Sequence, residues 1–139
     1  GQTGCSIHYR KGPVMQRLIN WFEIPVRDLD RARRFYEATF AVELKPEVME
    51  GMHMAIFPCD APATGGALLA CPEGKPGDHG VVIYLHGGDD LSVPLARAVA
   101  AGATVLMPRT ELSPEIGSIA MFADSEGNRI GLHSPGRGA

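Results

Sequence analysis

The sequence predicts an α+β fold in which two βαβββ modules form a curved mixed sheet around a shared cavity. The first observation is the stretch Leu18–Phe40, where the alternation of a strand runs directly into helical spacing. The second is a weak internal repeat, in which Asp28 and Asp90, 62 residues apart, occupy corresponding places. The third is residues 72–78, a segment rich in proline and glycine near the middle of the chain. Two half-sheets that cannot bury their inner faces alone are expected to pack together.

The composition indicates one soluble domain, or two small modules that share one core. The chain has 139 residues, of which 45% are hydrophobic, and no apolar run approaches the roughly 20 residues that span a bilayer. A net charge of −3 and a pI of 5.9 argue against a nucleic-acid partner. The three cysteines form no CxxC pair, which predicts a reduced, cytoplasmic protein.

Residues 1–14 look unlike the rest of the chain. They show no hydrophobic periodicity and lack the apolar core of a signal peptide. We therefore predict a leader or vector-derived segment over 1–14. A single domain is expected over 15–139, with modules of about 15–72 and 79–134.

Module one begins with a strand in which Ile19, Trp21 and Glu23 share one face. Asp28 is the expected N-cap of the helix that follows, and Asp30 places a negative charge in its first turn. Three further strands are predicted, over Val42–Val48, Met52–Phe57 and Gly65–Cys71.

Module two repeats this order. The predicted elements are a strand Val81–Leu85, a helix from Asp89 to about Ala101, a strand Thr104–Met107, a loop Pro108–Glu115, and a hairpin of Ile116–Ala123 with Asn128–His133.

Two motifs in these elements resemble the vicinal oxygen chelate superfamily, which includes glyoxalase I, bleomycin-resistance proteins and extradiol dioxygenases. Module one carries Val26-Arg27-Asp28-Leu29-Asp30-Arg31-Ala32 with Phe35-Tyr36, and module two carries Asp89-Asp90-Leu91, Ala100-Ala101-Gly102 and the run Phe122 to Ile130 (FADSEGNRI). The resemblance covers about Arg17 to Ser134. It implies the paired-module fold more strongly than a reaction, because one fold can host several chemistries.

The resemblance also implies four side chains that hold a divalent metal: a His or Gln on the first strand and a Glu on the fourth strand of each module. Alignment places the first-strand positions at Trp21 and Ile83, and the closing-strand position of module two at Gly131. The fourth strand of module one, 65–71, contains no acid. Trp, Ile and Gly cannot ligate a hard cation. No cofactor is therefore predicted, and a divalent metal is expected only at a non-standard site.

Two polar residues are left as candidates for chemistry. Glu23 lies two residues after Trp21, and His133 two residues after Gly131, so both are expected to face the cavity. We predict Glu23 and His133 as catalytic residues or ligand anchors. The alternative is that Glu23 only hydrogen-bonds backbone amides or an arginine at the rim. A carboxylate in an apolar cleft needs a partner or a raised pKa.

The expected walls of the cavity are apolar. Trp21 is either core packing or a stacking wall for a planar ligand. The full set of predicted ligand-binding residues is Trp21, Met54, Phe57, Ile83, Leu85 and Met107.

Two functions from different classes remain open at this point. In the first, the protein binds a small, partly aromatic molecule without changing it, similar to the bleomycin-resistance branch. In the second, it is a lyase, isomerase or dioxygenase of the glyoxalase I type that uses Glu23 and His133 in a rearranged site. A small-molecule partner is expected in both, and the resemblance also predicts a homodimer.

Overall fold

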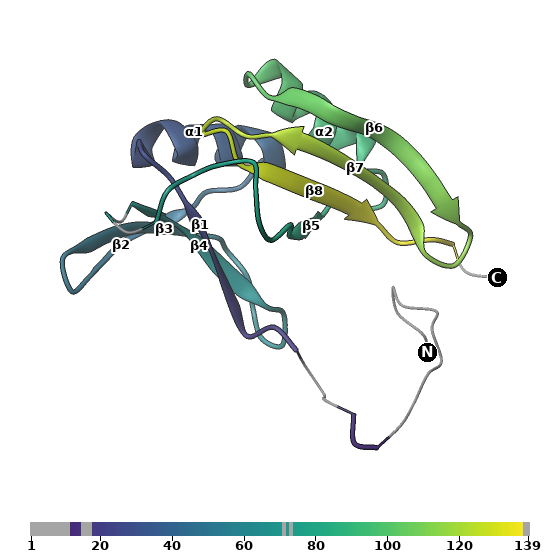
Figure 1. Ribbon diagram of the computed structural model, residues 1–139, viewed down its shortest axis with the longest axis horizontal. Coiled ribbons are helices and arrows are strands. Elements are labelled where there is room, and N and C mark those ends of the chain that lie inside the picture. The colour runs from purple at the N-terminus through teal and green to yellow at the C-terminus, as the bar shows by residue number, and fades with distance from the viewer. Residues whose placement is uncertain (1–11, 15–17, 71, 73, 138–139) are drawn as a thin grey trace.

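The computed structural model describes residues 12–14, 18–70, 72 and 74–137, and it contains the two βαβββ modules in succession (Figure 1). Most of the predicted leader lies outside the described residues. Module one consists of β1 (Trp21–Pro25), α1 (Leu29–Phe40), β2 (Lys45–Met49), β3 (Met52–Ile56) and β4 (Gly65–Ala70). Module two consists of β5 (Tyr84–His86), α2 (Ser92–Ala100), β6 (Thr104–Ser113), β7 (Gly117–Ala123) and β8 (Arg129–Ser134).

The internal repeat predicted from the sequence is confirmed by the sheet topology. Sheet A has the order β1-β4-β3-β2 and sheet B the order β5-β8-β7-β6. In each sheet the first strand pairs in parallel with the fourth, and the remaining pairs are antiparallel. The α+β class is therefore confirmed. The two sheets stay separate and unclosed, because no ladder joins them among the described residues.

Helix α1 begins as its sequence predicts. The Asp28 side chain accepts a hydrogen bond from the Arg31 backbone amide at 3.0 Å, which caps one of the otherwise unpaired amides of the first turn. The helix ends at Phe40, and Ala41 follows in the left-handed conformation with φ 55°. Its apolar stripe turns Ala32, Phe35 and Tyr36 into the core.

Several boundaries in module two differ from the prediction, and helix α2 begins at Ser92 rather than at Asp89. The segment Pro108–Glu115, expected to be a loop, is mostly strand, because β6 continues to Ser113. Irregular register on either side of Met107 leaves Pro108, which has no amide hydrogen, out of the ladder, so the edge strand tolerates it. Conversely, the strand expected over Val81–Leu85 is observed as β5 over Tyr84–His86, and Val81 is 90% exposed.

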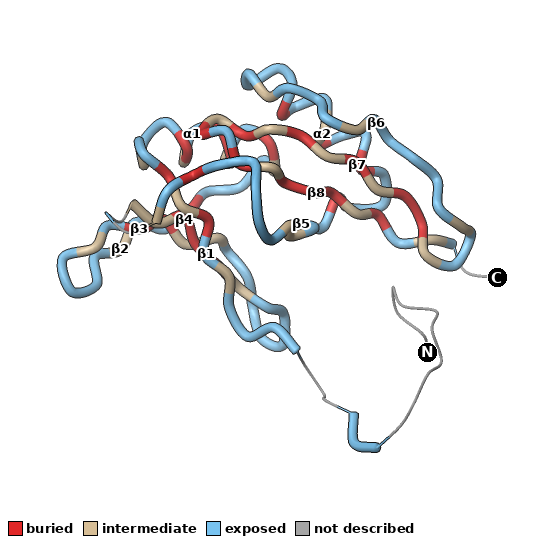
Figure 2. Tube along the Cα trace, viewed as in Figure 1, coloured by how far each residue is buried: buried red, intermediate tan, exposed pale blue. Residues whose placement is uncertain are grey.

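Both modules contribute to one hydrophobic core. The Phe35 ring lies 5.1 Å from Tyr36 and 5.9 Å from Phe122 of β7, measured between ring centroids. Ile24 of β1 and Leu132 of β8 belong to the same cluster. The red segments of Figure 2 run through α1, β7 and β8, whereas much of the outer strands β2 and β6 is exposed. No helix in the described part of the chain is long and apolar enough to cross a membrane.

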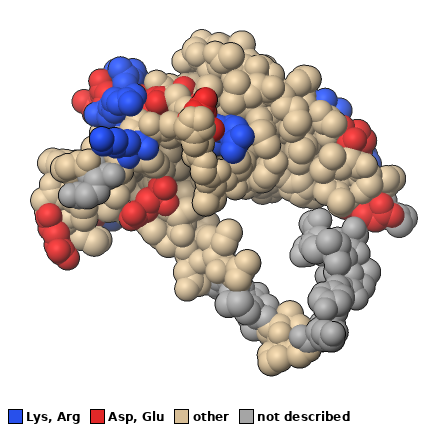
Figure 3. Space-filling view, in the orientation of Figure 1, with Lys and Arg blue, Asp and Glu red and all other residues tan. Residues whose placement is uncertain are grey.

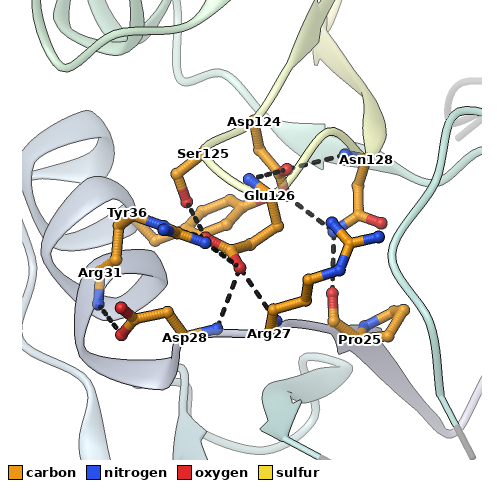
Figure 4. A network of polar contacts seen from close by, with 9 residues as sticks. All are labelled: Pro25, Arg27, Asp28, Arg31, Tyr36, Asp124, Ser125, Glu126 and Asn128. Carbon is orange, nitrogen blue, oxygen red and sulfur yellow. Dashed lines mark hydrogen bonds and ion pairs between the residues drawn. The ribbon is translucent and has the colours of Figure 1, made fainter.

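A buried carboxylate joins the modules where β1 ends and α1 begins (Figure 4). Glu126, in the turn between β7 and β8, is only 5% exposed. It accepts hydrogen bonds from the backbone amides of Arg27 and Asp28 at 2.9 and 3.0 Å. The Arg31 guanidinium donates two more, at 2.7 and 2.9 Å, in the bidentate geometry typical of arginine and carboxylate.

A second carboxylate in the same turn holds the turn itself in shape. Asp124 accepts hydrogen bonds from the backbone amides of Glu126 and Asn128. The buried Tyr36 hydroxyl donates to Asp124 at 2.7 Å, and the Asn128 side-chain amide donates to the Pro25 carbonyl at 2.9 Å. Burial, followed by the nearby Asp124 carboxylate, raises the pKa of Tyr36 well above its usual value. The turn of module two therefore fixes both ends of the β1–α1 connection.

The Glu126 network makes the folding stability depend on pH in the acidic range. Burial alone would raise the pKa of Glu126, but the hydrogen bonds from Arg31, Asp28, Arg27 and Ser125 outweigh it and lower the pKa from 4.5 to about 2. Between these values the unfolded chain binds a proton at Glu126 that the folded chain does not. The contribution of Glu126 is therefore complete above pH 4.5 and is lost as the pH falls to about 2.

We expect Glu126→Gln to lower the free energy of unfolding at pH 7 by about 1–3 kcal/mol, because buried donors lose a charged acceptor. Urea denaturation at pH 7 and at several values between pH 2 and 5 measures this. The variant should also lose less stability in acid than the parent chain. The exposed Glu43→Gln is the control and should leave both quantities unchanged. Identical acid profiles for Glu126→Gln and the parent chain would contradict the assignment.

Candidate functional site

The face of sheet A that turns away from the core carries the two residues predicted for the first strand. Phe22 and Ile24 point into the core, so Trp21 and Glu23 lie on the opposite side, which we call the open face. Trp21 is 45% exposed, and its ring lies over Gly65 of β4, where an added Cβ would come within 3.2 Å of the ring.

Sheet B has the same arrangement of an aromatic ring over a glycine on its own open face. Ile83 and Leu85 pack against the core, and Tyr84 between them is 45% exposed. The Tyr84 ring lies over Gly131 of β8, where an added Cβ would come within 2.5 Å of it. Tyr84 therefore occupies the position that corresponds to Trp21, one residue later than the Ile83 predicted by alignment. The alternation of Ile83 and Leu85 with Tyr84 was the signal that could have found it.

These positions do not suit a divalent metal. The family resemblance implied a His or Gln on each first strand and a Glu on each fourth strand. The structure places Trp21 and Tyr84 on the first strands and glycines opposite them, at Gly65 and Gly131. Within the described residues, no three His, Cys, Asp or Glu side chains gather in a group that could hold a metal ion. That the protein works without a cofactor stays a prediction.

A groove of about 430 Å³ lies where the two modules meet, and we call it the junction groove. It brings together the predicted residues Glu23 and Ile83. Its lining residues are Glu23, Ile24, Pro25, Lys75, Pro76, Gly77, His79, Val81, Ile83, Asn128, Arg129 and Ile130. They come from β1, the linker between β4 and β5, and the start of β8.

A second concavity, of about 410 Å³, is more apolar, and we call it the phenylalanine cleft. It brings together the predicted residues Phe57 and Leu85. Its lining residues are Phe22, Phe40, Val42, Phe57, Pro58, Cys59, Thr64, Gly65, Gly66, Leu85 and His86. Trp21 is not among them, because its ring covers Gly65 from the open face, whereas Phe22 points to the opposite side of β1.

Four predicted residues line neither concavity, namely Trp21, Met54, Met107 and His133. Met54 is buried, and strand register places it on the open face of sheet A. Met107 is half-buried and pairs with Met121 on the open face of sheet B. His133 is half-buried on β8, and its Nε2 lies 2.7 Å from the Ile116 carbonyl oxygen.

Glu23 and His133 do not line a common concavity among the described residues, and their joint role stays a prediction. Glu23 shares the junction groove with Arg129 and Ile130, whereas His133 lies further along β8 and pairs with His86. Glu23 itself is exposed, and its carboxylate accepts a hydrogen bond from Trp21 Nε1 at 3.3 Å. Neither the backbone amides nor the arginine considered from the sequence contacts this carboxylate among the described residues.

Charge is unevenly spread over the surface. Figure 3 shows charged side chains gathered mainly over the α1 end, whereas most of the visible face is uncharged. Two of the three arginines of α1 are paired with acids: Arg31 with Glu126, and Arg33 with Asp30 and Glu37.

Comparison with known proteins agrees with this architecture. A family model described as the Glyoxalase/Bleomycin resistance protein/Dioxygenase superfamily matches residues 18–132. The chain belongs to this superfamily. Its two modules, with their unclosed four-stranded sheets, are the vicinal oxygen chelate fold that the sequence resembled. A search of curated proteins found no significant match.

Several solved structures are similar. TnmS3, described as an antibiotic binding protein from Streptomyces sp. CB03234, is 27% identical with a TM-score of 0.63; the match covers 88% of this chain and 99% of that one. UcmS2 is 22% identical with a TM-score of 0.61, covering 86% of this chain and 98% of that one. A glyoxalase I mutant from Zea mays is 20% identical with a TM-score of 0.59, covering 82% of this chain and 44% of that one.

The packing of Tyr84 over Gly131 can be tested with Gly131→Ala. We expect the new methyl group to displace the Tyr84 ring and lower the free energy of unfolding by about 1 kcal/mol, since the exposed ring can swing outward. Urea denaturation measures the loss, and the ring resonances of Tyr84 in an NMR spectrum report the displacement. Gly77→Ala is the control, because a Cβ there meets nothing within 4 Å. Unmoved Tyr84 resonances would show that the ring does not cover Gly131.

Proposed function

We propose that this protein binds a small, partly aromatic molecule in the phenylalanine cleft and releases it unchanged. The observation that carries the proposal is the composition of the cleft. Three phenylalanine rings, Phe22, Phe40 and Phe57, line a concavity of about 410 Å³ at the meeting of the modules. Binding sites for small molecules are typically concave, of this size and mostly apolar, with a few polar groups that fix orientation.

The polar groups in the cleft are few and differ in kind. His86 accepts a hydrogen bond from the Gly88 amide through Nδ1 at 3.3 Å, so Nε2 is the nitrogen left to contact a ligand. Thr64 donates its hydroxyl hydrogen to the Ile19 carbonyl at 3.1 Å, and its oxygen can still accept. Phe57 lies 5.7 Å from Phe22 and 5.5 Å from Tyr36, ring to ring, so its orientation is fixed by packing.

The similarity to TnmS3 supports a binding function, because that protein is described as an antibiotic binding protein and the match covers nearly all of both chains. The side chains at the open face also support a binding function. Trp21 and Tyr84 offer no good ligand for a metal that would polarise a substrate. The alternative of an enzyme that uses Glu23 and His133 has no such support, since no concavity among the described residues is lined by both.

Two further properties belong to this proposal. We propose that the protein is a homodimer, in keeping with the exposed Trp21 and Tyr84 rings on the open faces of the two sheets. We also propose a reducing, cytoplasmic location, in keeping with the exposed free thiol of Cys59.

Binding can be measured by isothermal titration calorimetry with bleomycin and with 2-naphthol, a small neutral aromatic probe. We expect Phe57→Leu to weaken binding of the ligand that the parent chain binds by about fivefold, because an aromatic wall is worth roughly 1 kcal/mol. Phe122→Leu, in the core and outside the cleft, is the matched control and should leave affinity unchanged. Mass spectrometry of the recovered ligand should show no chemical change; a changed ligand would refute simple binding.

The homodimer can be tested by sedimentation velocity on the full chain. The expected result is a species of about twice the 14.9 kDa chain mass. A single species at the chain mass across micromolar concentrations would refute the proposal.

A further inference from the structure

The junction groove combines an apolar floor with basic side chains, a pattern unlike that of the phenylalanine cleft. Ile24 and Ile130 are each 3% exposed and lie in the core, and Ile83 is packed against them. The described basic side chains of the groove are Lys75, His79 and Arg129. The groove and the cleft share no lining residue, so they are two separate sites.

The charges in the groove do not cancel. Lys75 and Arg129 are positive and Glu23 is negative, which leaves one positive charge before His79 is counted. His79 lies 3.2 Å from the Asp78 carboxylate, outside the groove, so any charge on His79 is already balanced. Neither Lys75 nor Arg129 forms an ion pair with any residue that the structure describes.

Arg129 is held in place but incompletely bonded. Its Nη2 donates to the Gly80 carbonyl oxygen at 3.3 Å, which orients the guanidinium against the linker. Its Nε is buried, and no partner for it exists among the described residues. An unpaired buried donor is unfavourable, and a carboxylate is the partner that a guanidinium edge matches in geometry.

The walls of the groove are fixed before any ligand arrives. The linker between β4 and β5 runs past the start of β8 in Figure 1, and the Gly77 amide donates to the Asn128 side-chain oxygen at 3.0 Å. The side-chain amide of Asn128 in turn donates to the Pro25 carbonyl of β1. All three segments that line the groove therefore meet at Asn128. A preformed site loses less entropy on binding than a mobile one.

We propose that the junction groove is a second binding site, for a small apolar or aromatic monocarboxylate whose carboxylate pairs with Arg129. The body of such a molecule would lie on Ile24, Ile83 and Ile130, and Lys75 would add attraction at the mouth. Glu23 acts against a second negative charge, which favours a monoanion over a dianion. The site does not depend on the phenylalanine cleft or on its ligand.

The experiment is calorimetric titration of the full chain with 2-naphthoate. We expect one-to-one binding that weakens at least tenfold in Arg129→Gln and severalfold in Arg129→Lys, which keeps the charge but loses the planar fork. Glu23→Gln is expected to tighten binding severalfold, because it removes a repelling carboxylate. Arg109→Gln, an exposed arginine outside the groove, is the matched control and should bind as the parent chain does.

Two comparisons keep this result separate from that of the cleft. Phe57→Leu should leave 2-naphthoate binding unchanged, and circular dichroism of Arg129→Gln should show a folded protein. Unchanged 2-naphthoate affinity in folded Arg129→Gln, a loss confined to Phe57→Leu, or no binding of 2-naphthoate by the parent chain would each overturn the proposal. Weaker binding in Glu23→Gln would also overturn the role given to that carboxylate.

Discussion

The Glu126 carboxylate is the interaction on which the relation between the modules depends. It lies in a turn of module two, yet its donors come from module one: the amides of Arg27 and Asp28 and the guanidinium of Arg31. A buried charge without these donors would be strongly unfavourable, so the turn has one stable position against module one. That position fixes where β1 leaves the core. It thereby fixes the positions of Trp21 and Glu23 and of the walls of both concavities.

Much of the fold could be predicted because its signals are local. Asp28 reads as an N-cap from its immediate neighbours, and the run from Phe122 to Ile130 reads as a turn that closes a hairpin. The order of elements repeats between modules, so one half supports the reading of the other. Sequence alone was less informative about β6, because Pro108 normally indicates a loop and an irregular edge strand accommodates it here.

The site was harder to predict because it is assembled from distant segments. The junction groove joins Glu23, Lys75 and Arg129, which have no common sequence pattern. Glu23 and Ile83 were predicted and do lie together there. Arg129 was not predicted, because the sequence does not show that its Nε is buried without a hydrogen-bond partner. Tyr84 was missed for a simpler reason. The alignment matched Gly88 of module two to Val26 of module one, and counting five residues back from each gave Trp21 but Ile83, one residue before Tyr84.

The two aromatic residues that lie over glycines restrict which substitutions could create a metal site at these positions. Trp21 fills the space left by Gly65, and Tyr84 fills the space left by Gly131, so each ring and its glycine form one steric unit. A histidine at the place of Trp21 would uncover Gly65, and a glutamate at the place of Gly131 would collide with Tyr84. A metal centre at these positions would therefore require coordinated changes on paired strands, and no single substitution would create one.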